Sequence, residues 1–212
     1  MKRPGAMGLL VGLVGVTLVG LIVVGLANRE TQERNSAELV LEQQHRSALP
    51  VYDQLGQAFD FPSTHPGQGS LASAQGKVLL LSFGFTHCPD VCPLILNKYA
   101  QLFDVFERKG FADQVRLVFI TQDPKRDTLN QLRQHLGQFD KRIVGLRPDD
   151  QQRAALQDSL AVAMEPGAPM VAHSDRLFIL DPQGRVRAMP SVTEPTAQIV
   201  GDVTGLLSIP AK

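Results

Sequence analysis

An α/β domain of three layers, preceded by one membrane-spanning helix, is the fold class that this 212-residue sequence predicts. Apolar runs of strand length alternate with segments whose apolar residues recur at helical spacing, as in a sheet covered by helices. Residues 8–27 form a longer uncharged run, which matches the length that a bilayer span requires. Both cysteines stand in FGFTHCPDVCP, where the first long strand run gives way to a helical pattern.

The charge balance excludes one class of ligand. Lys and Arg together number 21, and so do Asp and Glu, so the formal net charge is zero. A protein that binds a nucleic-acid backbone needs a basic surface to neutralise phosphates. We therefore expect no nucleic-acid partner.

The N-terminus predicts a membrane anchor. Lys2 and Arg3 precede the apolar run 8–27, and basic residues remain on the cytoplasmic side of a span. A cleaved signal peptide is the alternative, since Gly25 and Ala27 are small, but secretory apolar regions are usually only about 7–15 residues long. We expect residues 1–27 to span the cell inner membrane once, with the soluble domain facing the periplasm.

Two further regions follow the anchor. Residues 28–49 are polar and charged, as in a juxtamembrane tether, and residues 50–212 form the folded domain. Residues 59–76 predict short strands and turns, and the apolar run 77–85 predicts a buried central strand.

A helix follows the cysteines. Pro93 suits its first turn and Gly110 ends it. Its apolar face consists of Leu94, Ile95, Leu96, Tyr99, Leu102, Phe103 and Phe106.

The rest of the chain continues the alternation of strands and helices. Asp127 or Thr128 is expected to cap a helix, whose leucines 129, 132 and 136 share one face. The further elements are a strand at 115–120 before that helix, a helix from 149 to about 162, strands at 176–180 and 185–188 around the turn 181–184, and a helix at 195–207.

This order of elements resembles the thioredoxin fold, with a helix inserted before the hairpin and an N-terminal extension. In that fold, the reactive cysteines follow the first central strand at the start of the first helix. Cys88 and Cys92 occupy that place.

The cysteine pair has three interpretations. A structural disulfide would close a loop of about five residues and contribute only about 2 kcal/mol. A redox role suits a helix N-terminus, which favours thiolate. Against it, three residues separate the cysteines where dithiol oxidoreductases have two, and Asp90 is expected to disfavour a neighbouring thiolate.

The third interpretation is a metal site. Two thiolates one helical turn apart can bind one ion, and sulfur selects Cu(I), zinc or iron–sulfur clusters. Two ligands are too few for tetrahedral zinc, so a third donor must come from elsewhere. The histidines are His45, His65, His87, His135 and His173. His87 points away from Cys88 if the loop is extended, and His173 ends the loop before the hairpin, where a histidine is usually a surface residue.

Three blocks, FGFTHCPDVCP, DPKRDT and AHSDRLFILDPQG, occur in this order and together resemble the Sco/SenC family. Members are membrane-anchored proteins for assembly of the copper centre of cytochrome c oxidase. The resemblance covers residues 59–207. It implies copper, as Cu(I) or Cu(II), held by Cys88, Cys92 and His173, with the two cysteines also able to form a redox disulfide.

The resemblance also implies partners. These are the copper-accepting subunit of cytochrome c oxidase, a copper donor, and a thioredoxin-like reductant that keeps both thiols reduced. It implies a metallochaperone that turns nothing over. The rival interpretations are an extracytoplasmic thiol-disulfide oxidoreductase, which keeps cysteines of the oxidase subunit reduced, and a copper or redox sensor.

Asp123, Arg126 and Asp127 match the family's loop near the metal, where a carboxylate tunes the site or docks a partner. Helix capping is the competing role of Asp127. The chain departs from the family's pattern at Ala172, where an acidic residue commonly precedes the ligand histidine, and at Arg147, where a glycine pair is interrupted.

Overall fold

The computed structural model describes residues 24–25, 28–29, 32, 53–54, 59–161 and 175–208. The chain has two compact units, Met1–Gln44 and His45–Lys212. In the first unit, the described residues are helical. No helix among the described residues has the length and apolar character needed to cross a membrane. Apart from those few residues, the predicted anchor and tether lie outside the described part of the chain.

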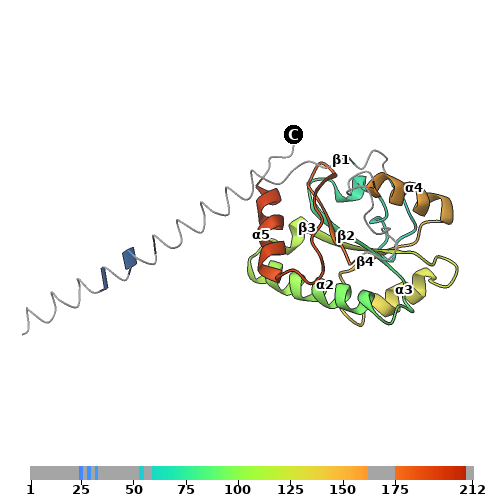
Figure 1. The fold of residues 1–212 in the computed structure, drawn as a ribbon, viewed down its shortest axis with the longest axis horizontal. Coiled ribbons are helices and arrows are strands. Elements are labelled where there is room, and N and C mark those ends of the chain that lie inside the picture. The colour runs from blue at the N-terminus through green and yellow to red at the C-terminus, as the bar shows by residue number, and fades with distance from the viewer. Residues whose placement is uncertain are drawn as a thin grey trace, which may run out of the picture. The chain divides into compact units, whose positions relative to one another are not determined.

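The second unit is built on one mixed sheet of six strands in the order β1-β6-β5-β2-β3-β4 (Figure 1). Strands β2, β3 and β4 are parallel, whereas β5 is antiparallel to β2 and forms a hairpin with β6. The strands are β1 (Asp53–Gln54), β2 (Val78–Gly84), β3 (Val115–Thr121), β4 (Val144–Leu146), β5 (Phe178–Leu180) and β6 (Arg185–Ala188).

Helices cover both faces of this sheet (Figure 1). Buried side chains of α2, α3 and α5 share one core with one face of the sheet, and those of α4 share a second core with the other face. The helices are α2 (Val91–Arg108), α3 (Leu129–Leu136), α4 (Asp150–Ala161) and α5 (Thr196–Leu207), with short 3-10 turns at Ala72–Ala74 and Ala112–Gln114. The three-layer α/β prediction is therefore confirmed.

The two cores follow from the alternation of side chains along the central strands. Leu80 and Phe119 face α2, whereas Leu79 and Val118 face α4. Because helices cover both faces of the sheet, the sequences of the central strands are nearly continuous apolar runs. The hydroxyl of the buried Tyr99 reaches the main-chain oxygens of Leu80 at 3.0 Å and Val118 at 3.2 Å, and so fixes α2 against β2 and β3.

Several sequence predictions hold, and others need correction. Gly110 has φ +77°, which is easily adopted only by glycine, and ends α2 as expected. Leu94 was assigned to the buried face of that helix, but it is 54% exposed. The sequence did not predict β1 or β4, which have only two and three residues.

The cap of α3 was assigned to Asp127 or Thr128, and it is Thr128. The Thr128 side chain accepts a hydrogen bond from the main-chain N–H of Gln131, and the Gln131 side chain accepts one from the main-chain N–H of Thr128. Asp127 is therefore free for another role.

Candidate metal centre

Cys88 and Cys92 lie at the carboxyl end of β2, on either side of the point where α2 begins. Cys88 is partly buried in the loop, and its N–H donates to Phe85 O at 3.2 Å. Cys92 belongs to the first turn of α2 and is only 2% exposed. The strand and the helix thus bring the two sulfur atoms together, as the sequence predicted for this junction.

Both cysteines are free thiols, and their environments differ. Burial opposes ionisation of Cys88, but the Cys92 thiol and the main-chain N–H groups of residues 90, 91 and 92 donate to its sulfur, and the pKa of Cys88 is lowered overall. Burial, together with the hydrogen bond to Cys88, raises the pKa of Cys92 to about 12. We expected Asp90 to disfavour a thiolate at Cys88, but its N–H stabilises one.

Gly84 allows Cys92 to pack against the end of β2. A Cβ atom at this position would lie 2.6 Å from Cys92 Sγ and 2.7 Å from Phe119 Cζ. Any side chain would therefore push Cys92 or the Phe119 ring away. Sequence reasoning did not single out Gly84, because a glycine at the end of a strand is common and its neighbour in space is eight residues away.

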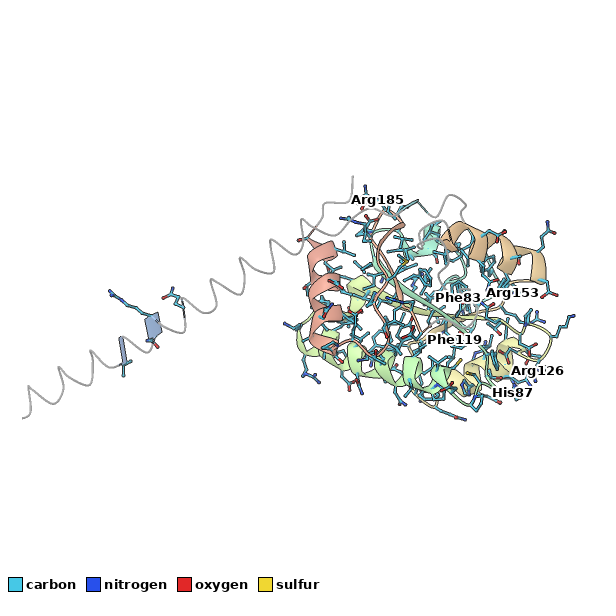
Figure 2. All side chains as sticks on the ribbon, viewed as in Figure 1. Phe83, His87, Phe119, Arg126, Arg153 and Arg185 are labelled. Atoms are coloured by element: carbon cyan, nitrogen blue, oxygen red, sulfur yellow. The ribbon has the colours of Figure 1, made fainter. Side chains whose placement is uncertain are left out.

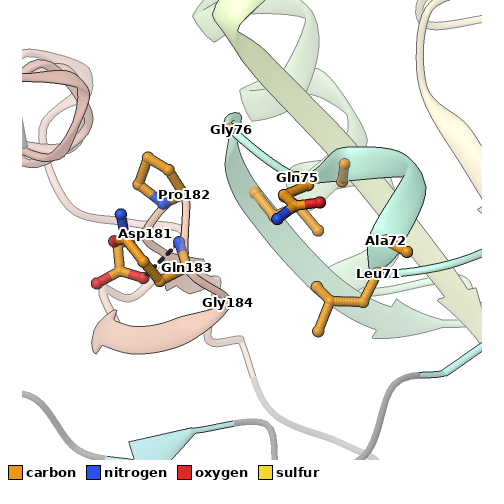
Figure 3. A pocket seen from close by; sticks show the side chains of 10 residues that line it. Leu71, Ala72, Gln75, Gly76, Asp181, Pro182, Gln183 and Gly184 are labelled. Atoms are coloured by element: carbon orange, nitrogen blue, oxygen red, sulfur yellow. Dashed lines mark hydrogen bonds between the residues drawn. The ribbon is translucent and has the colours of Figure 1, made fainter. Parts of the chain in front are cut away.

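A cleft of about 510 Å³ opens beside the cysteine pair. Its walls include both cysteines, the exposed Leu94 and, from the other side, Asp175 and Val192. Asp175 is fixed at this edge because its carboxylate accepts from Ser191 Oγ at 2.5 Å and its main-chain oxygen accepts from Val192 N at 2.8 Å. A larger hollow of about 720 Å³ lies at the opposite end of β2, between Leu71 and the turn of the β5–β6 hairpin (Figure 3). None of the described residues that line that hollow is a cysteine or a histidine.

Asp127 is fully buried and joins two strand ends near the cysteines. Its carboxylate accepts from Thr86 N at 3.1 Å, from Thr86 Oγ1 at 2.5 Å and from Thr121 Oγ1 at 2.6 Å. Thr86 precedes Cys88 by two residues, so Asp127 holds the start of the cysteine loop against the end of β3. Its negative charge also contributes to the raised pKa of Cys92, after burial and the Cys88 contacts.

Asp123 and Arg126 lie at the surface of the same loop, where they form an ion pair. The hydrogen bond from Arg126 is the main reason that the pKa of Asp123 is lowered. Figure 2 shows Arg126 and His87 at the same edge of the molecule. Arg147, which departs from the family's pattern, donates to Asp127 O at 3.0 Å and to Pro124 O at 2.6 Å, and so braces this loop from β4.

The structure places three of the five histidines. The His87 ring lies toward Asp127, with Nδ1 3.8 Å from Oδ1. His65 and His135 lie on or near α3, away from the cleft. His45 and His173 lie outside the described residues.

The donor set of this site fits a soft metal. Two sulfur atoms approach each other, and one of them favours the thiolate form that metals bind. Within the described ranges, no group of three His, Cys, Asp or Glu side chains is placed to hold one ion.

The fold and the site define a thioredoxin-like domain with a reduced Cys-x-x-x-Cys pair at its first strand–helix junction. The family model of SCO1/SenC matches residues 48–208. The chain belongs to the SCO1/SenC family, which confirms the resemblance seen in the sequence.

Individual relatives agree with this assignment. The human mitochondrial protein SCO2 homolog is 33% identical over 183 residues, which cover 83% of this chain and 65% of the human protein. The chain thus spans slightly less than two thirds of that relative's length. The structure of Bradyrhizobium japonicum ScoI with copper bound has 27% identity and a TM-score of 0.59, and covers 71% of this chain and 98% of that one.

A second similar structure is BsSco, described as a member of the Sco family of cytochrome c oxidase assembly proteins with a disulfide switch. It has 21% identity and a TM-score of 0.61, and covers 77% of this chain and 98% of that one, which shows the shared fold. Copper, the metal predicted from the sequence, is the metal bound in the Bradyrhizobium japonicum ScoI structure.

Proposed function

We propose that this protein is a copper chaperone that binds copper through Cys88, Cys92 and His173 and delivers it to a subunit of cytochrome c oxidase. The reduced cysteine pair with one favoured thiolate, at the edge of an open cleft, carries this proposal. It suits capture and release of a soft ion by ligand exchange. The copper-bound ScoI structure and the description of BsSco support the choice of metal and of recipient.

The position of Asp175 supports His173 as the third ligand. Asp175 lines the cleft beside the cysteines and is fixed there by Ser191 and Val192. His173 precedes it by two residues, and two residues span at most about 7 Å. The chain therefore keeps His173 within reach of the cleft, which is not so for His65 or His135.

Copper binding by this pair requires a reductant. Oxidation joins Cys88 Sγ to Cys92 Sγ, releases two protons and two electrons, and removes both thiolate ligands. A thioredoxin-like dithiol outside the cytoplasm restores them by exchange and becomes a disulfide itself. We place the protein in the inner membrane, anchored by residues 1–27, with its domain in the periplasm, where a copper donor and the oxidase subunit meet it.

The same pair supports a second candidate function. A thiolate at Cys88 and a protonated, buried Cys92 match the asymmetry of a dithiol that attacks a disulfide, so a reductase of the oxidase subunit's cysteines is the alternative. A sensor would use the same site without any acceptor.

Substitution of single ligands separates these functions. In the full chain in detergent, Cys88→Ser and Cys92→Ser should each abolish Cu(I) binding against a competing chelator. His173→Ala should lower copper affinity by at least about 10–100-fold, because loss of a residue that only hydrogen-bonds to a metal ligand already costs that much. Disulfide exchange with a model protein should stay near normal in His173→Ala, because that reaction needs only the two sulfur atoms.

Oxidase assembly in cells decides between chaperone and reductase. Loss of assembly in His173→Ala, at normal exchange, supports the chaperone. Normal assembly despite lost copper binding refutes it and leaves the reductase. The matched control is His65→Ala, since His65 lies away from the cleft and should change neither copper affinity nor assembly.

A further inference from the structure

The three described histidines differ in which ring nitrogens are engaged. His65 Nε2 lies 3.0 Å from Lys141 O, which can only accept, and His65 Nδ1 lies 3.0 Å from Thr64 Oγ1. Both of its nitrogens are used. His135 Nε2 is buried and has no partner in the described part of the chain. His87 is exposed, and only its Nδ1 has a described partner.

The hydrogen bonds of Thr86 fix the proton of the His87 ring. Thr86 Oγ1 has one hydrogen, and it donates this to Asp127 Oδ1 at 2.5 Å. The contact of 2.9 Å between Thr86 Oγ1 and His87 Nδ1 is therefore a hydrogen bond only if Nδ1 is the donor. In the neutral ring, Nε2 then has no proton, and the lone pair of this exposed side chain is available to a metal.

A histidine that ligates a metal usually donates its other ring N–H to a carboxylate or another acceptor, which fixes the tautomer and raises the basicity of the ligating nitrogen. Thr86 is that acceptor for His87, and the buried Asp127 carboxylate stands directly behind it, 3.8 Å from Nδ1. We propose that His87 Nε2 is a second, peripheral copper ligand that captures Cu(II) at the surface beside the cysteine pair.

Its position gives this ligand a function in loading. His87 and Cys88 are consecutive, so an ion held at Nε2 is already at the edge of the cysteine loop. Transfer inward is ligand exchange, in which the bond from copper to Nε2 breaks as a bond to Cys88 sulfur forms and the oxidation state is unchanged. Cu(II) is the favoured ion because imidazole binds Cu(II) more strongly than it binds the other first-row divalent ions. This loading function rests on the proposed copper site at the cysteines, whereas binding at Nε2 does not.

The first test needs no metal. Long-range ¹H–¹⁵N spectra of the reduced full chain in detergent, at a pH where the rings are neutral, should show His87 with its proton on Nδ1 and His65 with its proton on Nε2. Signals are assigned with His87→Gln and His65→Gln. A proton on Nε2 of His87 overturns the proposal.

The second test uses Cu(II) without the cysteine ligands. In Cys88→Ala/Cys92→Ala, and in the oxidised wild-type chain as a second form, substoichiometric Cu(II) should broaden the ring signals of His87 before those of His65. Thr86→Val, which removes the acceptor for Nδ1–H, should weaken this binding about tenfold. Equal broadening of His65 and His87 overturns the proposal.

The third test measures loading. Stopped-flow mixing of Cu(II) with reduced His87→Gln should load the cysteines several-fold more slowly than wild type, with unchanged affinity at equilibrium, and His65→Gln should load normally. An unchanged rate in His87→Gln refutes capture by His87. If no variant loads copper at its cysteines, the proposed function fails, and the first two tests still decide the His87 site.

Discussion

At the scale of single residues, the two sulfur atoms differ because one faces the start of α2 and the other lies inside the core. Cys88 receives hydrogen bonds from the first N–H groups of the helix and from Cys92, whereas Cys92 packs against Gly84 and Phe119. The Cys88 sulfur is therefore ready, as a thiolate, to bind a metal or attack a disulfide first, and the Cys92 sulfur reacts after it. This order of events suits both copper capture and disulfide exchange.

The reactivity of the thiols should report this asymmetry. The pKa of Cys88 is lowered from 9.0, so its thiolate should form, and its alkylation by iodoacetamide should rise, at a pH below 9.0. The pKa of Cys92 is raised to about 12, so Cys92 should react only at much higher pH. Mass spectrometry of the reduced chain after timed alkylation across pH gives both profiles. Equal profiles, or a Cys92 that reacts first, would contradict the asymmetry.

The sequence predicted the cysteines of this site but not their electrostatics. Asp90 was expected to repel a thiolate because a sequence shows its charge and not the direction of its N–H. Gly84 was missed for a similar reason, since its contact with Cys92 exists only when β2 and α2 pack. His173 remains a prediction that depends on the family resemblance and on the short chain between it and Asp175.

At the scale of elements, the site depends on the junction of β2, β3 and the loop before α3. Asp127 connects these three through Thr86, Thr121 and its own main chain, and Arg147 fastens the loop from β4. From the sequence, Asp127 was expected either to cap a helix or to lie in the loop near the metal. Thr128 caps α3, and Asp127 supports the cysteine loop from behind.

Substitution of Asp127 should therefore affect stability more than a lost cap would. Asp127→Ala leaves the hydrogen-bond donors of the partly buried Thr86 and the buried Thr121 unpaired and should lower the free energy of unfolding by about 3 kcal/mol. Thr128→Ala should cost about 1 kcal/mol, as for other N-caps. Asp123→Ala, at the exposed pair with Arg126, should change little. Urea unfolding of the reduced chain compares the three, and a cost for Asp127→Ala no greater than that for Thr128→Ala would refute the supporting role.

Element length explains which parts of the fold were predictable. β2, β3 and α2 have runs of seven or more residues and clear apolar patterns, and the sequence predicted them within two residues. β4 has three residues around Gly145, a glycine that allows Leu136 and Thr64 to approach within 3 Å of a Cβ position. So short a segment carries no periodicity, and it becomes a strand because β3 offers it a partner.

At the scale of the whole molecule, the proposed function requires the domain to act close to a membrane enzyme, and the N-terminal sequence predicts an anchor that would keep it there. An uncharged run at residues 8–27 is about 30 Å long as a helix, which matches the apolar thickness of a bilayer. In the predicted arrangement, residues 28–49 then separate the domain from the membrane surface. A tethered chaperone meets its recipient at a high local concentration, which a freely diffusing domain at the same copy number does not reach.

We therefore predict that residues 1–27 remain on the mature protein. In cells, the chain should stay in the membrane fraction after an alkaline carbonate wash, and mass analysis should find residues 8–27 in it. Exchange of residues 1–27 for a cleavable signal peptide should leave copper affinity unchanged but reduce oxidase assembly, because the span supplies proximity and no ligand. Recovery of a soluble wild-type chain that begins at residue 28 would replace the anchor with a signal peptide. Full assembly by the released domain would show that proximity is not what the anchor provides.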